Sequence, residues 1–101
     1  MNLTPLKRLD IFVEGHALEP LERVLGEAGF KGWSVLTAVE GAGAHGAWHQ
    51  TGVGEAEARL VIAIGTEPAS SSVLAWLADY FRNYPGIVSV TDVSVMRGDR
   101  F

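Results

Sequence analysis

The fold is decided by the segment Val39–Trp48, which reads VEGAGAHGAW, and by the residues that come directly after it. The segment contains the pattern G-x-G-x-x-G after an apolar run, as in a dinucleotide-binding strand–helix–strand unit. Such a unit needs a helix next, because the free N–H groups at the helix N-terminus hold the pyrophosphate. Residues 47–54 instead contain further glycines and no apolar residues at helical spacing, and residues 58–64, ARLVIAI, are typical of a strand. The sequence therefore predicts a strand, a long glycine loop and another strand, which argues against the dinucleotide-binding unit.

Hydrophobic periodicity predicts the other elements on both sides of this loop. Leu9, Ile11 and Val13 alternate as in a half-buried strand, whereas the next apolar residues recur at helical spacing until Gly29. The expected strands are residues 8–14, 33–39, 58–65 and 87–96, and the expected helices are residues 18–28 and a second helix that begins at the cap residues Ser70–Ser72 and ends before residues 83–86. This order predicts a ferredoxin-like βαββαβ fold of the α+β class. We expect one domain over residues 1–101, with a four-stranded antiparallel sheet and two helices on one of its faces.

The composition argues against several classes of function. The 101 residues carry a net charge of −4 and no cysteine, so disulfides, cysteine-ligated zinc and thiol nucleophiles are excluded. No basic stripe is visible, which argues against binding to nucleic acid. No apolar run reaches the length of a membrane span and residues 1–5 lack the apolar core of a signal peptide, so we expect a cytoplasmic protein without membrane insertion. The carboxylates form no recognisable acid–base pair, so we do not expect an enzyme.

The second face of the expected sheet is too apolar for contact with water. The residues that alternate with the first set are Phe12, Leu36, Ala38, Val61 and Ala63. An exposed apolar patch of this extent is uncommon in a monomer. We therefore expect a homo-oligomer.

The last expected strand shows a change of phase near Asp92. Apolar residues alternate in one phase before it and in the other phase after it, as Val88 and Val90 and then Val93 and Val95. A one-residue slip of this kind moves side chains to the other face of a sheet. It indicates either a β-bulge or a strand whose two halves meet different neighbours.

Further segments carry a family resemblance. Residues 31–35, KGWSV, open the second strand, a Gly-x-Gly at Gly41 and Gly43 precedes the long loop, and the chain closes with residues 86–97, GIVSVTDVSVMR, and 99–101, DRF. Over about the whole chain this pattern resembles the P-II-like signalling proteins, and most of all their divergent carboxysome-associated branch. The resemblance implies a homotrimer whose clefts between subunits bind adenine nucleotides. It also implies that the long loop, called the T-loop in this family and expected at about 41–57, engages a target protein.

The resemblance further implies which residues bind the nucleotide. They are Ser34, Gly41, Ala42, Gly43, Ala44, His45, Gly86, Ile87, Val88, Arg97 and Arg100. Glycines let consecutive N–H groups approach a phosphate, and arginines offer forked donors to phosphate oxygens held by a neighbouring subunit. Relatives often have arginine or glutamine where this chain has Ala44-His45, so we expect ADP or AMP rather than ATP. For both arginines the alternative is solvated charge at the chain end.

The carboxysome-associated branch implies bicarbonate as a second ligand near the same loop, and no further cofactor is expected. It also implies a role in inorganic carbon metabolism and a location in the cytoplasm, in association with carboxysomes. Trp48 and His49 are expected to contact the unknown target protein, because an exposed tryptophan in a glycine loop can anchor a partner. The alternatives for Trp48 are that it folds over a ligand or packs back onto its own domain. No tyrosine lies in residues 41–57, so regulation by uridylylation of this loop is not expected.

Two alternatives remain open from the sequence. His45 and His49 could hold a metal ion, as in a CutA-like or P-II-like protein of heavy-metal tolerance. Their spacing places them on one face only in a helix, and the glycines around them disfavour a helix. The other alternative is a structural trimer without a ligand.

Overall fold

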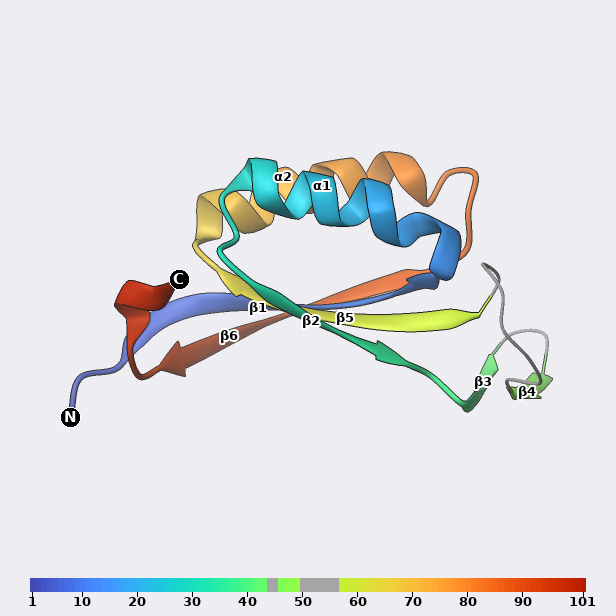
Figure 1. The fold of residues 1–101 in the computed structure, drawn as a ribbon, viewed down its shortest axis with the longest axis horizontal. Coiled ribbons are helices and arrows are strands. Elements are labelled where there is room, and N and C mark those ends of the chain that lie inside the picture. The colour runs from blue at the N-terminus through green and yellow to red at the C-terminus, as the bar shows by residue number, and fades with distance from the viewer. Residues whose placement is uncertain (44–45, 50–56) are drawn as a thin grey trace.

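The computed structural model describes residues 1–43, 46–49 and 57–101 (Figure 1). Its strands are β1 (Thr4–Glu14), β2 (Trp33–Thr37), β3 (Glu40–Gly43), β4 (Gly46–His49), β5 (Ala58–Gly65) and β6 (Ile87–Val95). Its helices are α1 (Leu18–Ala28) and α2 (Glu67–Tyr80), with short 3-10 helices at Gly15–Ala17 and Gly98–Arg100. No helix in these ranges is long and apolar enough to cross a membrane.

One antiparallel sheet organises the molecule. Its strands lie side by side in the order β2, β5, β1, β6. Both α1 and α2 cover the same face of this sheet (Figure 1). The element order and the layering confirm the predicted ferredoxin-like α+β fold.

The core lies between this sheet and the two helices. Leu9, Ile11 and Val13 of β1 point toward the helices and are buried, as their alternation predicted. They meet the apolar stripes of the helices, which are Leu21 and Leu25 of α1 and Ala69, Val73 and Leu77 of α2. Each of these leucine, isoleucine and valine side chains, fully buried, stabilises the fold by roughly 1.5–3 kcal/mol. β1 extends from Thr4, four residues before its predicted start, because its N-terminal half pairs with β6.

The helix ends follow local sequence signals, with one correction. α1 ends where predicted, at Gly29, whose φ of 109° is the left-handed conformation that glycine adopts without strain. The prediction that Ser70–Ser72 cap the second helix is wrong. Thr66 is the cap, since its Oγ1 accepts a hydrogen bond from the N–H of Ala69 at 3.3 Å, and Pro68 occupies the first turn.

The open face of the sheet, opposite the helices, differs from the prediction in β5. Val61 and Ala63 are buried beneath the helices, because they pair with Ile11 and Leu9 and therefore share their side of the sheet. The open face consists of Leu6, Arg8, Asp10 and Phe12 of β1, Ser34 and Leu36 of β2, Leu60, Ile62 and Ile64 of β5, and Ile87, Ser89, Thr91, Val93 and Val95 of β6. Phe12 and Leu36 lie on it as predicted, and most of its residues are apolar, although it also carries polar and charged side chains. Ala38 lies beyond the end of β2.

β6 contains no bulge at Asp92, where the sequence had left a bulge as one of two alternatives. Its pairing with β1 is continuous from Phe12 opposite Ile87 to Thr4 opposite Val95. Val88 and Val90 lie on the helix side, whereas Val93 and Val95 lie on the open face. The change of phase therefore marks two halves of a regular edge strand that contribute apolar side chains to different faces.

The region predicted as one glycine loop at about 41–57 contains a short hairpin. β3 pairs with β4, so that Glu40 lies opposite His49 and Gly41 lies opposite Trp48. β2 ends at Thr37 rather than at Val39. Ala44, His45 and residues 50–56 lie outside the described residues.

Candidate functional site

Three segments meet at the end of the sheet where β1 ends and β6 begins. The N–H of Gly15 donates to the carbonyl oxygen of Glu57 at 2.8 Å, which ties the end of β1 to the chain just before β5. The ring of His16 lies 5.5 Å from that of Tyr84, in the connection between α2 and β6. Tyr84 in turn stacks on Tyr80 of α2, with ring centroids 4.7 Å apart. This end of the sheet also carries the β3–β4 hairpin in Figure 1. Aromatic stacking and a backbone hydrogen bond therefore hold the three segments together here.

The candidate residues at this end offer backbone rather than charge. Gly41 and Ala42 lie in β3, so Gly41 contributes an extended backbone without a side chain. Ile87 is 67% exposed on the open face, whereas the half-buried side chain of Val88 packs against the core, so only its backbone is free to face a ligand. Among the described residues, Arg59 lies next to this region, and its guanidinium is paired with Glu57 at 3.1 Å. Of the side chains that the structure describes here, this arginine is therefore already neutralised by a carboxylate.

Arg97 and Arg100 lie at the opposite end of the sheet. They line a depression of about 400 Å³ together with Met96 and Phe101. Arg97 has a φ of 61°, which is uncommon for a residue with a side chain. It begins a turn in which the N–H of Arg100 donates to the carbonyl oxygen of Arg97 at 2.9 Å. Lys31 Nζ donates to the carbonyl oxygen of Asp99 at 3.5 Å. Both arginines thus belong to a defined backbone turn at the chain end.

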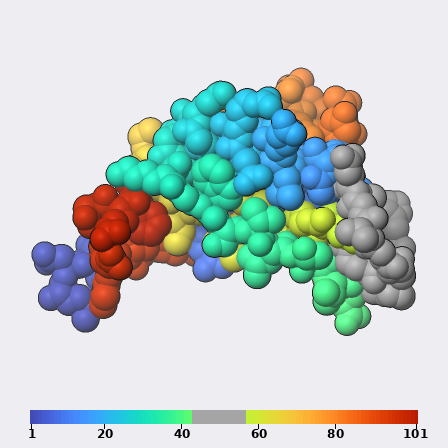
Figure 2. All heavy atoms as spheres, viewed as in Figure 1, coloured from blue at the N-terminus to red at the C-terminus, as the bar shows by residue number. Residues whose placement is uncertain are grey.

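One chain does not bring these two groups of candidate residues together. The paired stretch of β1 and β6 runs from Phe12 and Ile87 at one end to Thr4 and Val95 at the other. Eight steps along a strand span about 26 Å, at about 3.3 Å for each residue. Figure 2 shows the C-terminal segment and the β3 segment as separate projections at opposite ends of the molecule. Ser34 lies between the two groups, exposed on the open face.

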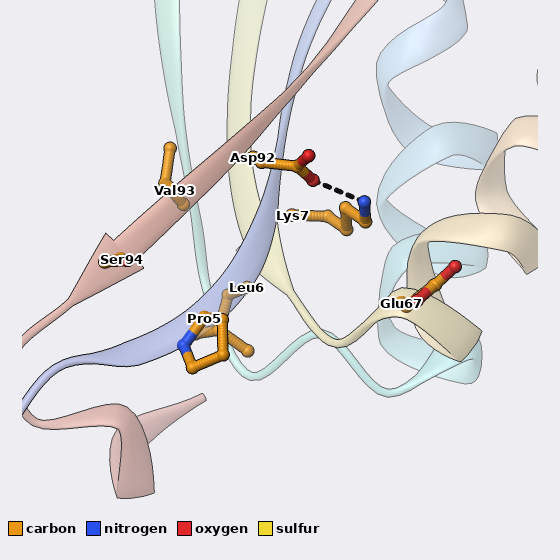
Figure 3. A pocket seen from close by; sticks show the side chains of 7 residues that line it. All are labelled: Pro5, Leu6, Lys7, Glu67, Asp92, Val93 and Ser94. Atoms are coloured by element: carbon orange, nitrogen blue, oxygen red, sulfur yellow. Dashed lines mark hydrogen bonds and ion pairs between the residues drawn. The ribbon is translucent and has the colours of Figure 1, made fainter.

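A second depression, of about 470 Å³, was not predicted from the sequence. It is lined by Pro5, Leu6, Lys7, Glu67, Asp92, Val93 and Ser94 (Figure 3). The ammonium group of Lys7 bonds to the carboxylate of Asp92, and this bond and the charge of Asp92 raise the pKa of Lys7, to which Glu67 also contributes. With two carboxylates around one ammonium, this depression offers no excess positive charge to a phosphate. The pairing of Lys7 with Asp92 brings the β1 and β6 residues together, and α2 adds Glu67, an arrangement that no local motif signals.

No candidate metal site supports the metal-binding alternative within the described part of the chain. There, no group of three or more histidine, aspartate or glutamate side chains is suited to hold a metal ion. His16 is paired with Glu14 at 3.2 Å. His45 lies outside the described residues, and His49 is placed only through its backbone in β4.

Comparison with known proteins identifies the family. The profile of the family described as "Nitrogen regulatory protein P-II" matches residues 6–100. This chain belongs to the P-II family. The resemblance inferred from the sequence is thereby confirmed, and the protein is a PII-like regulatory protein. Among curated proteins no sequence matches this chain significantly.

Solved structures of PII-like proteins superpose on the whole of this chain. CPII, a nitrogen regulatory PII-like protein from Thiomonas intermedia K12, bound to ADP, AMP and bicarbonate, is 29% identical, with a TM-score of 0.90 over 99% of this chain and 96% of that chain. CPII bound to ADP and bicarbonate is 30% identical, with a TM-score of 0.86 over 99% and 97% of the two chains. A putative PII-like signaling protein from Thermus thermophilus is 27% identical, with a TM-score of 0.83 over 100% and 99%.

The open face adds residues to the surroundings of the candidate site that were not predicted from the sequence. Ile87 lies in one row across the sheet with Phe12, Leu60 and Leu36. This row is apolar throughout and lies at the same end of the sheet as Gly86. Leu60 was missed because the alternation of β5 was assigned to the wrong face. The pairing of Leu60 with Phe12 corrects the assignment.

Proposed function

We propose that this protein is a homotrimeric PII-like sensor that binds ADP or AMP in the clefts between neighbouring subunits. Occupancy of a cleft sets the conformation of the T-loop, at about 41–57, and thereby controls the binding of a target protein. The observation that carries the proposal is the distribution of the candidate residues, whose glycines and arginines lie at opposite ends of one chain. A site that contains both needs two copies of the chain.

The distribution of charge supports a site in which one copy supplies backbone N–H groups and the other supplies arginine side chains. At the end of the sheet with Gly86 and Ile87, Arg59 is neutralised by Glu57 and Arg82 pairs with Asp79 at 3.4 Å. Backbone N–H groups of Gly41 to His45 can hold a phosphate, but a diphosphate also needs compensating positive charge. Arg97 and Arg100 of a neighbouring subunit supply it, because guanidinium groups offer paired donors to phosphate oxygens.

The nucleotide class follows from the number of cations. A site with two arginines and no cation at Ala44-His45 favours ADP or AMP over ATP, whose additional phosphate would lack a partner. Structures of CPII bound to ADP, AMP and bicarbonate support this choice, since they resemble this chain over nearly its whole length. His45 would donate to a phosphate or to bicarbonate, the second ligand.

The open face supports self-association. Its apolar residues cover all four strands, and an uncovered patch of this kind is unfavourable in water. Three copies that pack these faces together bury them and form three equivalent clefts. The T-loop, with Trp48 and His49, then projects from each cleft toward a target. By resemblance to the carboxysome-associated branch, that target belongs to inorganic carbon metabolism.

Complementation between two variants tests the proposal directly. Gly41→Val keeps a residue suited to the extended strand β3 but adds bulk beside the phosphates. The double variant Arg97→Ala with Arg100→Ala removes the cations from the other end. We expect each variant alone to lose ADP binding by at least about tenfold, and mixed trimers refolded from both to recover high-affinity sites, because some clefts then combine two intact halves.

Calorimetric titration of these samples distinguishes the alternatives. Binding of ADP or AMP with recovery in mixed trimers supports the proposal. No recovery would place the site within one chain. Binding of copper or zinc without nucleotide binding would favour the metal-binding alternative. No binding of ADP, AMP, ATP, bicarbonate or metal by a stable trimer would favour a structural role.

A further inference from the structure

Arg8 and Asp10 form an ion pair in the middle of the open face. Arg8 Nε donates to Asp10 Oδ1 at 2.8 Å, and both side chains are partly exposed, at 40% and 33%. The pairing of the strands places Arg8 beside Ile64 and Thr91 and places Asp10 beside Ile62 and Ser89. The pair thus lies among apolar and hydroxyl side chains and carries the charges of this part of the open face.

The pair leaves hydrogen-bonding capacity unused. Among the described residues, the two terminal amino groups of Arg8 and the Oδ2 atom of Asp10 make no hydrogen bond. In the isolated chain water can satisfy them. When the open face is covered, each unpaired donor and acceptor becomes costly, and a charged group more so than a neutral one.

We propose that Arg8 of one subunit pairs with Asp10 of the next, and that this contact selects the register in which copies of this chain assemble. This inference rests on the proposed homotrimer. Each copy presents both a surplus donor and a surplus acceptor at the same place, so its open face is complementary to a second copy. In a cyclic assembly every subunit gives its guanidinium to one neighbour and its carboxylate to the other. Apolar contacts alone are compatible with many registers, whereas a charged pair on the covered face disfavours all registers that leave it unpaired.

The charge-swapped variant, with Arg8→Asp and Asp10→Arg together, separates contacts between subunits from the contact within the chain. Alone, it restores an opposite-charge contact in either case and should assemble like the unmodified chain. In a mixed assembly, however, Arg8 of one subunit would face the introduced arginine of its neighbour. Subunits of the two kinds should therefore avoid one another, because like charges brought together on a covered face disfavour the wrong partner.

The measurement is native mass spectrometry of the two proteins after they are unfolded, mixed in equal amounts and refolded. We expect mixed trimers at least about tenfold below the statistical proportion. The matched control swaps the exposed i,i+4 pair of α1, with Glu19→Arg and Arg23→Glu, and should mix statistically with the unmodified chain. Statistical mixing of the swapped open-face variant would overturn the proposal, and so would a swapped variant that folds but stays monomeric.

A milder substitution keeps the test available if the swapped variant does not fold. Asp10→Asn preserves the shape of the side chain but leaves the neighbouring guanidinium without a carboxylate. We expect the concentration needed for half-assembly, measured by sedimentation, to rise at least about tenfold, with Glu19→Gln unchanged. Unchanged assembly of Asp10→Asn would contradict the proposal. If even the unmodified chain remains monomeric at micromolar concentration, the proposed trimer itself is wrong, which this series distinguishes from an error about the pair.

Discussion

The backbone of Gly86 lies against the carbonyl oxygen of Phe12, so closely that a Cβ atom on Gly86 would stand 2.7 Å from that oxygen. The same Cβ would stand 2.5 Å from a ring carbon of Phe81, and φ at Gly86 is +148°, which side chains rarely adopt. Gly86 therefore allows the connection after α2 to enter β6 beside the end of β1. The residue that was predicted as part of the ligand site is also required by the fold.

For Gly86→Ala we expect a loss of about 2 kcal/mol in the free energy of unfolding, because the methyl group must displace backbone atoms and the φ angle is unfavourable. Urea denaturation measures the loss. Gly32→Ala is the matched control, since a Cβ at Gly32 would meet nothing within 4 Å. Equal stability of the two variants would show that the connection adapts without cost.

For Tyr80→Phe we expect a gain in stability of about 1 kcal/mol at neutral pH. Among the described residues, none forms a hydrogen bond with the buried hydroxyl of Tyr80, and a buried hydroxyl without a partner is costly. Tyr84→Phe serves as the control, because Tyr84 is 49% exposed. Urea unfolding at pH 7 compares the two variants, and a loss of stability in Tyr80→Phe would reveal a partner for this hydroxyl.

The same residue predicts a dependence of stability on alkaline pH. Burial raises the pKa of the Tyr80 phenol above its ordinary value, with a further contribution from the charge of Glu14. The folded chain holds this proton more tightly than the unfolded chain. The stability that the bound proton contributes is therefore complete below about pH 10 and is lost as the pH rises through the folded pKa. The difference in unfolding free energy between Tyr80→Phe and the unmodified protein should therefore widen above pH 10. A constant difference would contradict the raised pKa.

For Arg97→Ala and Arg100→Ala, tested singly, we expect ADP affinity to fall by about tenfold to a hundredfold, since each removes hydrogen bonds to a charged phosphate. Thermal stability should change little, because both side chains lie at the exposed chain end. Arg23→Ala on the outer surface of α1 is the control and should bind ADP normally. Calorimetry with ADP and with adenosine, which has no phosphate, checks the assignment, because only ADP affinity should fall.

The pairing of Gly41 with Trp48 predicts a spectroscopic signal of ligand binding. A ligand whose phosphates contact Gly41 alters the surroundings of the paired strand, so the fluorescence of Trp48 should shift when ADP, AMP or bicarbonate is added. Trp48→Phe removes this signal and separates it from Trp33 and Trp76. An equal shift in the Trp48→Phe variant would show that the change arises away from the T-loop.

Local patterns were sufficient for the order of the main-sheet strands and the two helices, though not for the β3–β4 hairpin. The alternation of Leu9, Ile11 and Val13 predicted both the strand and its buried side, and Gly29 marked the end of α1. The P-II resemblance also rested on residues close in sequence, and the family match confirms it. These features depend on interactions between near neighbours in the chain, such as helix capping and the two-residue period of a strand.

The errors arose where distant pairing decides. Val61 and Leu60 are equally suited to a buried strand position, and only the register with Ile11 and Phe12 shows which of them faces the helices. Ser70–Ser72 are good cap residues, but α2 begins earlier at Thr66, which accepts a hydrogen bond from Ala69. The change of phase in β6 could not be interpreted before its regular pairing with β1 was known.

The sequence by itself determined the four strands of the main sheet, the two helices and the resemblance to the P-II family, because these depend on short spacings and short motifs. Only the tertiary structure decided that Gly41 and Gly86 lie at one end of the sheet and Arg97 and Arg100 at the other, and that Arg8 and Asp10 share the open face. The physical reason is that antiparallel pairing brings together residues from opposite ends of the chain, as with Lys7 and Asp92, whose contact no local pattern contains.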